Sequence, residues 1–180
     1  MDIFAKWQRQ DTPEKNRIPA LIVGALIFPI SAPALIVFFA PHIDVYLGWG
    51  SFFRGWPNFL IGVLSVLTGG ASAFWTIIEQ IRLASGTPFP MLPTKQLLVA
   101  GPFAYCRNPM TLGTILAYAG IAIWIGSPSA VLAVAAITAT LVGYLKCIEE
   151  KELLLRFGDE YAEYKKKTPF MIPMPPRKNR

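Results

Sequence analysis

The stretch that decides the fold is Leu112–Leu145, LGTILAYAGIAIWIGSPSAVLAVAAITATLVGYL, which contains no Lys, Arg, Asp or Glu. It belongs to two apolar segments, at about residues 109–125 and 129–147. A helix rises about 1.5 Å per residue, and the hydrocarbon core of a bilayer is roughly 30 Å thick. Both segments are at the short end of the range, and their flanks extend them. The stretch therefore predicts a helical hairpin in a membrane.

Two polar segments flank this hairpin. Gly101–Gly113 reads GPFAYCRNPMTLG, and Glu149–Pro169 reads EEKELLLRFGDEYAEYKKKTP. Because a two-helix hairpin returns the chain to the side on which it started, both segments are expected at the same end. This placement indicates a site built at the membrane surface.

The composition extends the membrane interpretation to the whole chain. Hydrophobic residues make up 53% and charged residues 16% of the 180 residues, and the mean hydropathy is +0.43. These values lie away from the usual soluble mixture. Apolar segments at about 18–40 and 57–80 join the hairpin. We predict an all-α, polytopic membrane helix bundle with about four transmembrane spans and a C-terminal amphipathic helix, in a single domain over residues 1–180.

Charge placement predicts the orientation. Of the 17 Lys and Arg residues, four precede the first span, three lie between the second and third, and nine follow the fourth. Only Arg54 lies between the first and second spans, and none lies between the third and fourth. Cytoplasmic loops carry the excess of Lys and Arg in multi-pass proteins. An integral, multi-pass protein is therefore expected, with both termini and both polar segments in the cytoplasm.

The same charges and a few single residues limit the partners. The net charge of +6 favours contact with anionic membrane lipids, and the scatter of basic residues around span ends argues against nucleic acid. Cys106 and Cys147 are expected as free thiols on the reducing side. The only histidine, His42, is expected in a solvated outer loop over 42–56, which argues against a His-rich metal site.

The second span carries small residues at recurring positions. Such residues let helices approach closely in lipid, so this span is expected to pack tightly against a neighbour. The residues are Gly62, Ser65, Gly69, Gly70 and Ala73.

The first polar segment offers an anion site and flat surfaces. Pro109 suits the first turn of a helix, with Asn108 as its N-cap. The free N–H groups of a helix start favour an anionic group, and Arg107 adds a planar charge beside them. Phe103 and Tyr105 offer surfaces for a planar ring. A capped helix with a snorkelling arginine explains these residues equally well.

The second polar segment offers two carboxylates and a helix that could cover the site. Glu149 and Glu150 directly follow an apolar run, where a charge needs water, a cation or a ligand, and Lys146 can pair with either along a helix. A solvated helix start is the simpler explanation. The helix that follows is amphipathic and could lie over the site, with a bend at Gly158. Its apolar face comprises Leu153, Leu154, Phe157, Tyr161 and Tyr164.

Together the two segments offer partners for an anion, a cation and a ring. S-adenosyl-L-methionine carries a carboxylate, an ammonium with a sulfonium, and an adenine. The chain has no GxxxxGK[ST] loop for ATP and no GxGxxG of a Rossmann-type methyltransferase domain.

The two segments resemble the isoprenylcysteine carboxyl methyltransferase and phospholipid methyltransferase superfamily of integral membrane enzymes. Its hallmark is G-[VP]-Y-x-x-x-R-H-P-x-Y-x-G, followed after a hairpin by E-E-x-x-L-x-x-x-F-G-x-E-Y-x-x-Y-x-x-x-x-P. The similarity covers roughly residues 93–173. It implies S-adenosyl-L-methionine bound on the cytoplasmic side by residues of 94–111 and 149–169. It also implies a lipophilic small-molecule or lipid acceptor that enters from the bilayer.

Carried over by position, the resemblance implies a set of site residues and no metal. The candidate catalytic residues are Arg107, Asn108 and Glu150. The residues implied to line the cofactor are Gln96, Leu97, Leu98, Phe103, Asn108, Pro109, Met110, Thr111 and Glu149.

The chain departs from the family pattern at three positions. Asn108 replaces a histidine, Thr111 replaces a tyrosine, and Leu145 lies near the position where prenylcysteine enzymes use an arginine. These departures argue against prenylcysteine as the acceptor and leave carboxylate, amine and thiol acceptors open. The alternatives are a phospholipid N-methyltransferase and a non-catalytic four-span membrane protein that retains the scaffold.

Overall fold

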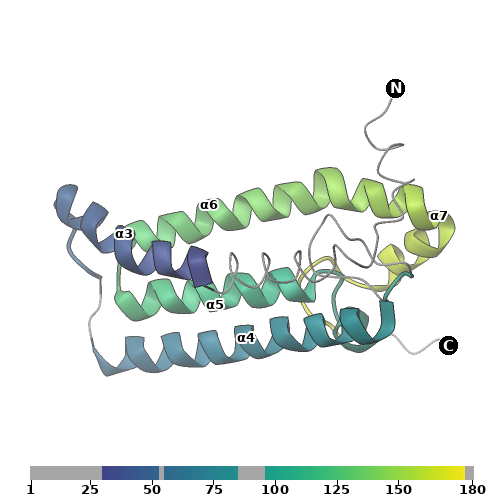
Figure 1. Cartoon of the computed structure of the whole chain (residues 1–180), viewed down its shortest axis with the longest axis horizontal. Helices are drawn as coiled ribbons and strands as arrows, with labels where there is room; N and C mark the ends of the chain where they lie inside the picture. The colour runs from purple at the N-terminus through teal and green to yellow at the C-terminus, as the bar shows by residue number, and fades with distance from the viewer. Residues whose placement is uncertain (1–29, 53–54, 85–95, 177–180) are drawn as a thin grey trace, which may run out of the picture.

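The computed structural model describes residues 30–52, 55–84 and 96–176, and all regular structure in these ranges is helical. Helices α4, α5 and α6 lie lengthwise beside one another, and α3 lies along one end of this group (Figure 1). The kinked helix α7 closes the opposite end. The elements are α3 (Ala32–Tyr46), α4 (Trp56–Ala84), η3 (Gly101–Ala104), α5 (Pro109–Ile125), α6 (Pro128–Tyr144), η4 (Leu145–Glu149) and α7 (Glu150–Lys167).

The helices agree with the apolar pattern of the sequence. Two helices, over Trp56–Leu83 and over the continuous run Pro128–Lys167, are long and apolar enough to cross a membrane by length and composition. The apolar helices α3 and α5 are shorter. The prediction of an all-α chain is thus confirmed for the described residues, and α5 has the predicted bounds of the third span. Residues 18–29 of the first predicted span lie outside the described residues.

The prediction that an outer loop begins at His42 is wrong, because this residue lies within helix α3. Helix α3 continues through Pro41 and His42 to Tyr46, and the His42 ring nitrogen Nδ1 lies 2.6 Å from the Phe38 carbonyl oxygen. Pro41 removes one backbone donor, but it does not end the helix. The last turn is held instead by Asp44, whose buried carboxylate reaches a neighbouring helix.

Asp44 ties the end of α3 to the start of α6. Its carboxylate accepts hydrogen bonds from the Ser127 hydroxyl and from the Ser129 backbone N–H, the latter at 2.9 Å. The Ser127 oxygen in turn accepts from the Ala130 N–H at 3.1 Å, as an N-cap does. A buried carboxylate that accepts backbone N–H groups at a helix start also complements the helix dipole.

Replacing Asp44 by alanine is expected to lower the free energy of unfolding by about 1–3 kcal/mol, because donors of α6 lose their buried acceptor. Thermal unfolding in detergent, followed by circular dichroism, measures this loss. Asp159→Ala, at an exposed position of α7, serves as the control and should change the midpoint little. If the unfolding midpoint shifted equally in the two variants, Asp44 would not be what connects α3 to α6.

Helices α4 and α5 pack through glycines. A Cβ added to Gly69 would lie 2.5 Å from the Gly113 carbonyl oxygen, and one added to Gly62 would lie 2.8 Å from the Gly120 oxygen. The close packing predicted for the second span is therefore confirmed, with Gly113 and Gly120 as its partners. Gly70 is the exception, since a Cβ there would meet nothing within 4 Å.

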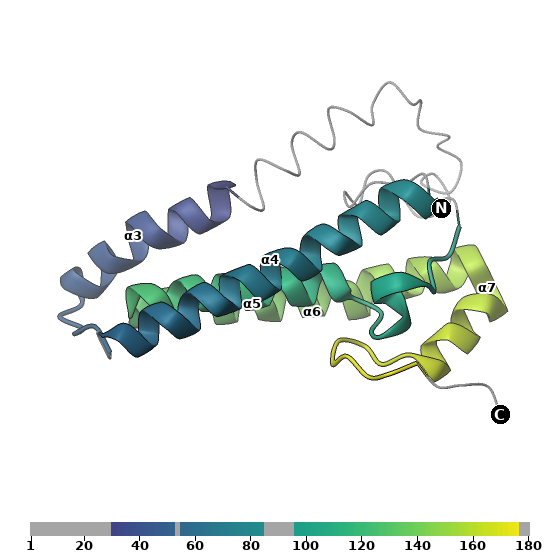
Figure 2. The ribbon, with the colours of Figure 1, turned by 90° about the horizontal axis from the view of Figure 1, so that it is seen from below.

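The chain folds back at the end of the bundle that carries α7. Gly158 has φ 52° and ψ −125°, which confirms the predicted bend and turns the second half of α7 toward the start of α5. Residues 169–174, called the strap here, then run back along the bundle to the level where α5 begins (Figure 2). The Arg107 N–H donates to the Pro169 oxygen at 2.9 Å, and the Met174 N–H donates to the Tyr105 oxygen at 3.0 Å.

Candidate functional site

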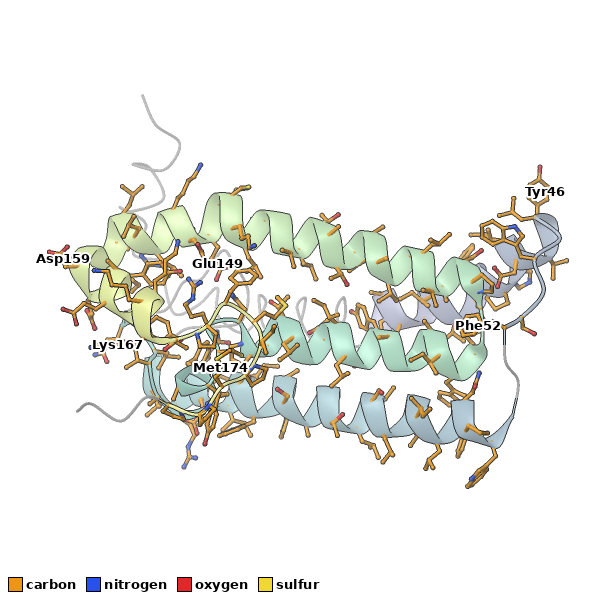
Figure 3. The ribbon with its side chains drawn as sticks, turned by 180° about the vertical axis from the view of Figure 1, so that it is seen from behind. Tyr46, Phe52, Glu149, Asp159, Lys167 and Met174 are labelled. Carbon is orange, nitrogen blue, oxygen red and sulfur yellow. The ribbon has the colours of Figure 1, made fainter. Side chains whose placement is uncertain are left out.

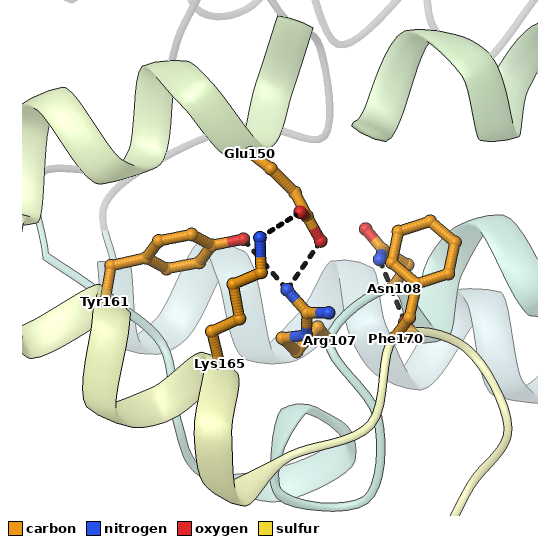
Figure 4. A network of polar contacts seen from close by, with 6 residues as sticks. All are labelled: Arg107, Asn108, Glu150, Tyr161, Lys165 and Phe170. Carbon is orange, nitrogen blue, oxygen red and sulfur yellow. Dashed lines mark hydrogen bonds and ion pairs between the residues drawn. The ribbon is translucent and has the colours of Figure 1, made fainter. Parts of the chain in front are cut away.

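An ion-pair cluster joins the two polar segments where α5 and α7 meet. The Arg107 guanidinium nitrogen Nη1 lies 2.5 Å from the Glu150 carboxylate, and the Lys165 ammonium lies 2.6 Å from the other oxygen of that carboxylate (Figure 4). The side chains of Arg107 and Glu150 are only 9% and 13% exposed. The structure thus brings two of the predicted catalytic residues into direct contact.

The folded-back half of α7 adds two buried tyrosines. Arg107 Nη1 also donates to the Tyr161 hydroxyl oxygen at 3.3 Å, and the Tyr164 hydroxyl donates to the Phe103 carbonyl oxygen at 2.7 Å. Burial, the first cause in each case, raises the pKa of both tyrosines above the ordinary range, so both hydroxyls stay neutral. The expectation that the amphipathic helix covers this region holds for these tyrosines, whereas Leu154 on the same predicted face is 48% exposed.

Asn108 occupies the N-cap position of α5, but its side chain does not cap the helix. Its amide Nδ2 donates instead to the Phe170 carbonyl oxygen in the strap, at 2.9 Å. The backbone oxygen of Asn108 accepts from the Leu112 N–H at 3.0 Å. The side-chain cap predicted for Asn108 is therefore wrong: the amide is turned to the strap, and its oxygen accepts no hydrogen bond from the first turn of α5. The Met110 and Thr111 N–H groups are left without a side-chain cap.

Phe170 lies beside the cluster, next to Asn108 (Figure 4), and the sequence prediction did not include it. The Arg107 guanidinium carbon is 5.6 Å and the Lys146 ammonium 5.0 Å from the centre of its ring. Both distances fit cation–π contacts. Lys146 was expected to pair with one of the glutamates, but it contacts the aromatic ring of Phe170 instead. The only feature of the sequence that could have indicated Phe170 is that it is the one aromatic residue in a Pro-rich tail.

Glu149 adjoins Glu150 in the chain, but the cluster does not engage its carboxylate. It ends the π-helical turn η4, is half-buried, and makes no hydrogen bond or ion pair with other described residues (Figure 3). Burial, followed by the nearby charges of Glu152 and Glu150, raises the pKa of Glu149 to about 7. A carboxyl with this pKa changes charge near neutral pH and attracts a cation when it is ionised.

The other predicted cofactor residues lie along the same approach to α5. Pro109 is buried, and Gln96 is exposed. The remaining ones are half-buried: Leu97, Leu98, Phe103, Met110 and Thr111. Gly101, with φ 60°, passes close to α4, where an added Cβ would lie 3.2 Å from Glu79 Cγ. In the described ranges, no group of His, Cys, Asp and Glu is arranged to hold a metal ion.

Comparison with known families gives one finding. A family model described as phospholipid methyltransferase matches residues 57–160, more than half of the chain. The matched range contains α5, α6, η4 and the first half of α7, and therefore both Arg107 and the Glu149–Glu150 pair. Comparison with curated proteins and with solved structures gives no significant match.

Proposed function

The chain belongs to the phospholipid methyltransferase family, and we propose that it is a membrane methyltransferase that uses S-adenosyl-L-methionine and a lipophilic or amphipathic acceptor. The family match over residues 57–160 carries this proposal. It is supported by the geometry, because the first polar segment and the start of the second, which both lie inside the match, meet at one end of an apolar helix bundle.

The residues at this end fit the charged parts of the cofactor. We assign the cationic part to Glu149, because Glu150 is already bonded to Arg107 and Lys165. The carboxylate would be held by the uncapped N–H groups of Met110 and Thr111 at the start of α5. Phe103 and residues 96–98 would line the uncharged parts.

Arg107, Asn108 and Glu150 would act by positioning. The Arg107–Glu150 pair connects the start of α5 to the start of α7, next to Glu149. Asn108 holds the strap over the same helix start. When bound, S-adenosyl-L-methionine supplies an electrophilic methyl group on a sulfonium, which an acceptor attacks in line. The protein's share of the rate would then come mainly from orientation and exclusion of water.

The acceptor decides whether a base is needed. A carboxylate or thiolate attacks the methyl carbon without losing a proton, whereas a primary or secondary amine must release one. A phospholipid amine is a second candidate acceptor, favoured by the description of the matching family.

For the topology we propose four spans, with both termini and the site in the cytoplasm. The asymmetric distribution of Lys and Arg supports this orientation. Cys147 is exposed and lies two residues before Glu149, so an impermeant thiol reagent should label it only from the cytoplasmic side. Cys106 is 1% exposed and cannot serve as a second reporter.

The direct test is equilibrium binding of S-adenosyl-L-methionine to the detergent-purified, folded protein, compared with Glu149→Ala and with Glu163→Ala. Glu163 is an exposed glutamate of α7 and should tolerate the change. Loss of binding in Glu149→Ala alone is expected. A folded, unmutated protein that binds no cofactor would refute the proposal. Transfer of a labelled methyl group to phosphatidylethanolamine would identify the amine class of acceptor.

Cofactor binding is expected to strengthen as the pH rises through 7. Only ionised Glu149 attracts a cation, and an acid of pKa about 7 is mostly protonated at pH 6 and mostly ionised at pH 8. The affinity should therefore rise about tenfold over this range. Titrations at fixed ionic strength measure it. Glu149→Gln should bind more weakly at pH 8 and lose this dependence, so an unchanged slope in Glu149→Gln would assign the titration to another group.

A further inference from the structure

The strap carries apolar side chains that no described part of the protein covers. Its sequence, PFMIPM, contains no charged residue. Ile172 is 72% exposed and Met174 is 52% exposed, although Phe170 between Pro169 and Met171 is half-buried against the cluster. The strap is therefore anchored on one side and presents apolar groups on the other.

Its anchors place the strap at the depth where a membrane helix begins. The Phe170 carbonyl is bonded to Asn108, the residue directly before α5, and Met174 is bonded to Tyr105. Ile172 lies two residues beyond Phe170, which in an extended chain corresponds to about 7 Å. Figures 1 and 2 both show the strap beside the start of α5. Since α5 is an apolar helix of a membrane protein, this level corresponds to the boundary between head groups and acyl chains.

Basic residues flank the strap in the sequence. Lys165, Lys166 and Lys167 precede it and are exposed, with Lys165 paired with Glu150 and Lys167 paired with Glu163, and the sequence RKNR follows it at residues 177–180. Apolar side chains beside lysines are typical of segments that lie in an anionic membrane surface. Pro169 and Pro173 have no N–H group, which lowers the number of donors left unsatisfied in lipid.

We infer that residues 171–174 of the strap insert into the head group and upper acyl region of the membrane, and that its basic flanks bind anionic lipid head groups. A second copy of the chain is disfavoured as the occupant, because two basic flanks would then face each other. A lipid surface offers the complementary charge as well as the apolar phase. The insertion requires no methyl transfer and stands apart from the proposed function.

A fluorescent probe at position 172 tests the insertion. Ile172→Cys is made in a Cys147→Ser background, labelled with an NBD maleimide and reconstituted in phosphatidylcholine vesicles with and without phosphatidylglycerol. Cys106 stays unlabelled, because it is 1% exposed and burial raises its thiol pKa, and Cys147→Ser alone verifies this. Asp159→Cys, at an exposed position of α7 outside the basic flank, is the matched control.

The expected result is a blue-shifted NBD emission at position 172, protected from iodide and quenched by lipids with a shallow doxyl group. Phosphatidylglycerol should increase this quenching, and the probe at position 159 should remain accessible to iodide. A water-like, iodide-accessible emission at position 172 in both kinds of vesicle would overturn the inference. Protection that persists in detergent and grows with protein concentration would also overturn it, since a second copy would then be the cover.

Discussion

Replacing Gly69 by alanine is expected to destabilise the protein, while the same change at Gly70 is expected to be neutral or slightly stabilising. The Cβ added at position 69 would lie 2.5 Å from the Gly113 carbonyl oxygen, which is backbone and cannot turn aside. Helices α4 and α5 must then separate along their length. Overpacking of this kind costs about 1–3 kcal/mol. Leucine at this position should prevent accumulation of folded protein.

The neighbouring glycine makes this prediction sharp. Alanine at Gly70 meets nothing within 4 Å, and alanine is about 1 kcal/mol better than glycine inside a helix. Both variants have the same composition and the same hydropathy. Thermal unfolding in one detergent, measured by circular dichroism and by size-exclusion profile, separates them. If the two alanine variants unfolded at the same temperature, the glycine contact between α4 and α5 would not hold the bundle together.

Removing the Glu150 carboxylate should have an equally large effect. Glu150→Ala leaves the Arg107 guanidinium, only 9% exposed, without its main partner. Breaking one side of a buried ion pair costs roughly 3–5 kcal/mol. Under the proposed function, methyl transfer should fall as well, because the start of α5 and Glu149 lose their connection. Unfolding and cofactor binding are both measured for this variant.

A second ion pair on the same helix supplies the control. Glu163 pairs with Lys167 at 3.3 Å, but the two side chains are 70% and 57% exposed. Exposed pairs contribute at most about 1 kcal/mol, so Glu163→Ala should be nearly silent. The double variant Arg107→Met with Glu150→Ala should recover part of the lost stability, since no unpaired buried charge remains. Strictly additive losses would contradict a direct coupling between Arg107 and Glu150.

The helices could be predicted from the sequence because apolar runs in this chain end at clear signals. Helix α5 begins at Pro109 and ends at Ile125, as predicted, and Gly126 after it has the positive φ of 65° that suits a helix end. The end of α3 could not be predicted in this way. That end depends on the hydrogen bond between Ser127 and Asp44, and local periodicity does not predict a contact between residues so far apart in the sequence.

The location of the candidate site could be predicted from the sequence, but the individual side-chain contacts within it could not. The hairpin brings the two polar segments to one end, so the meeting of Arg107 with the glutamates was within reach. The π-helical turn η4 ends at Glu149, directly before Glu150, and such a turn shifts the phase of the helix that follows, so a regular helical period does not predict which glutamate pairs with the arginine. The bend at Gly158 then brings Lys165 and Tyr161 back to the pair. The position of Phe170 follows from that bend and from no local pattern.

The fold-back at Gly158 also sets the order in which the protein can be assembled during its synthesis. Helices α4, α5 and α6 precede the bend in the chain, and the glycine contacts between α4 and α5 can form while translation continues. Lys165, Tyr161 and the strap are made after them, and Met174 pairs with Tyr105 only when it has left the ribosome. Helices α4, α5 and α6 can therefore pack in the membrane before the candidate site exists, and the contacts of the site form last.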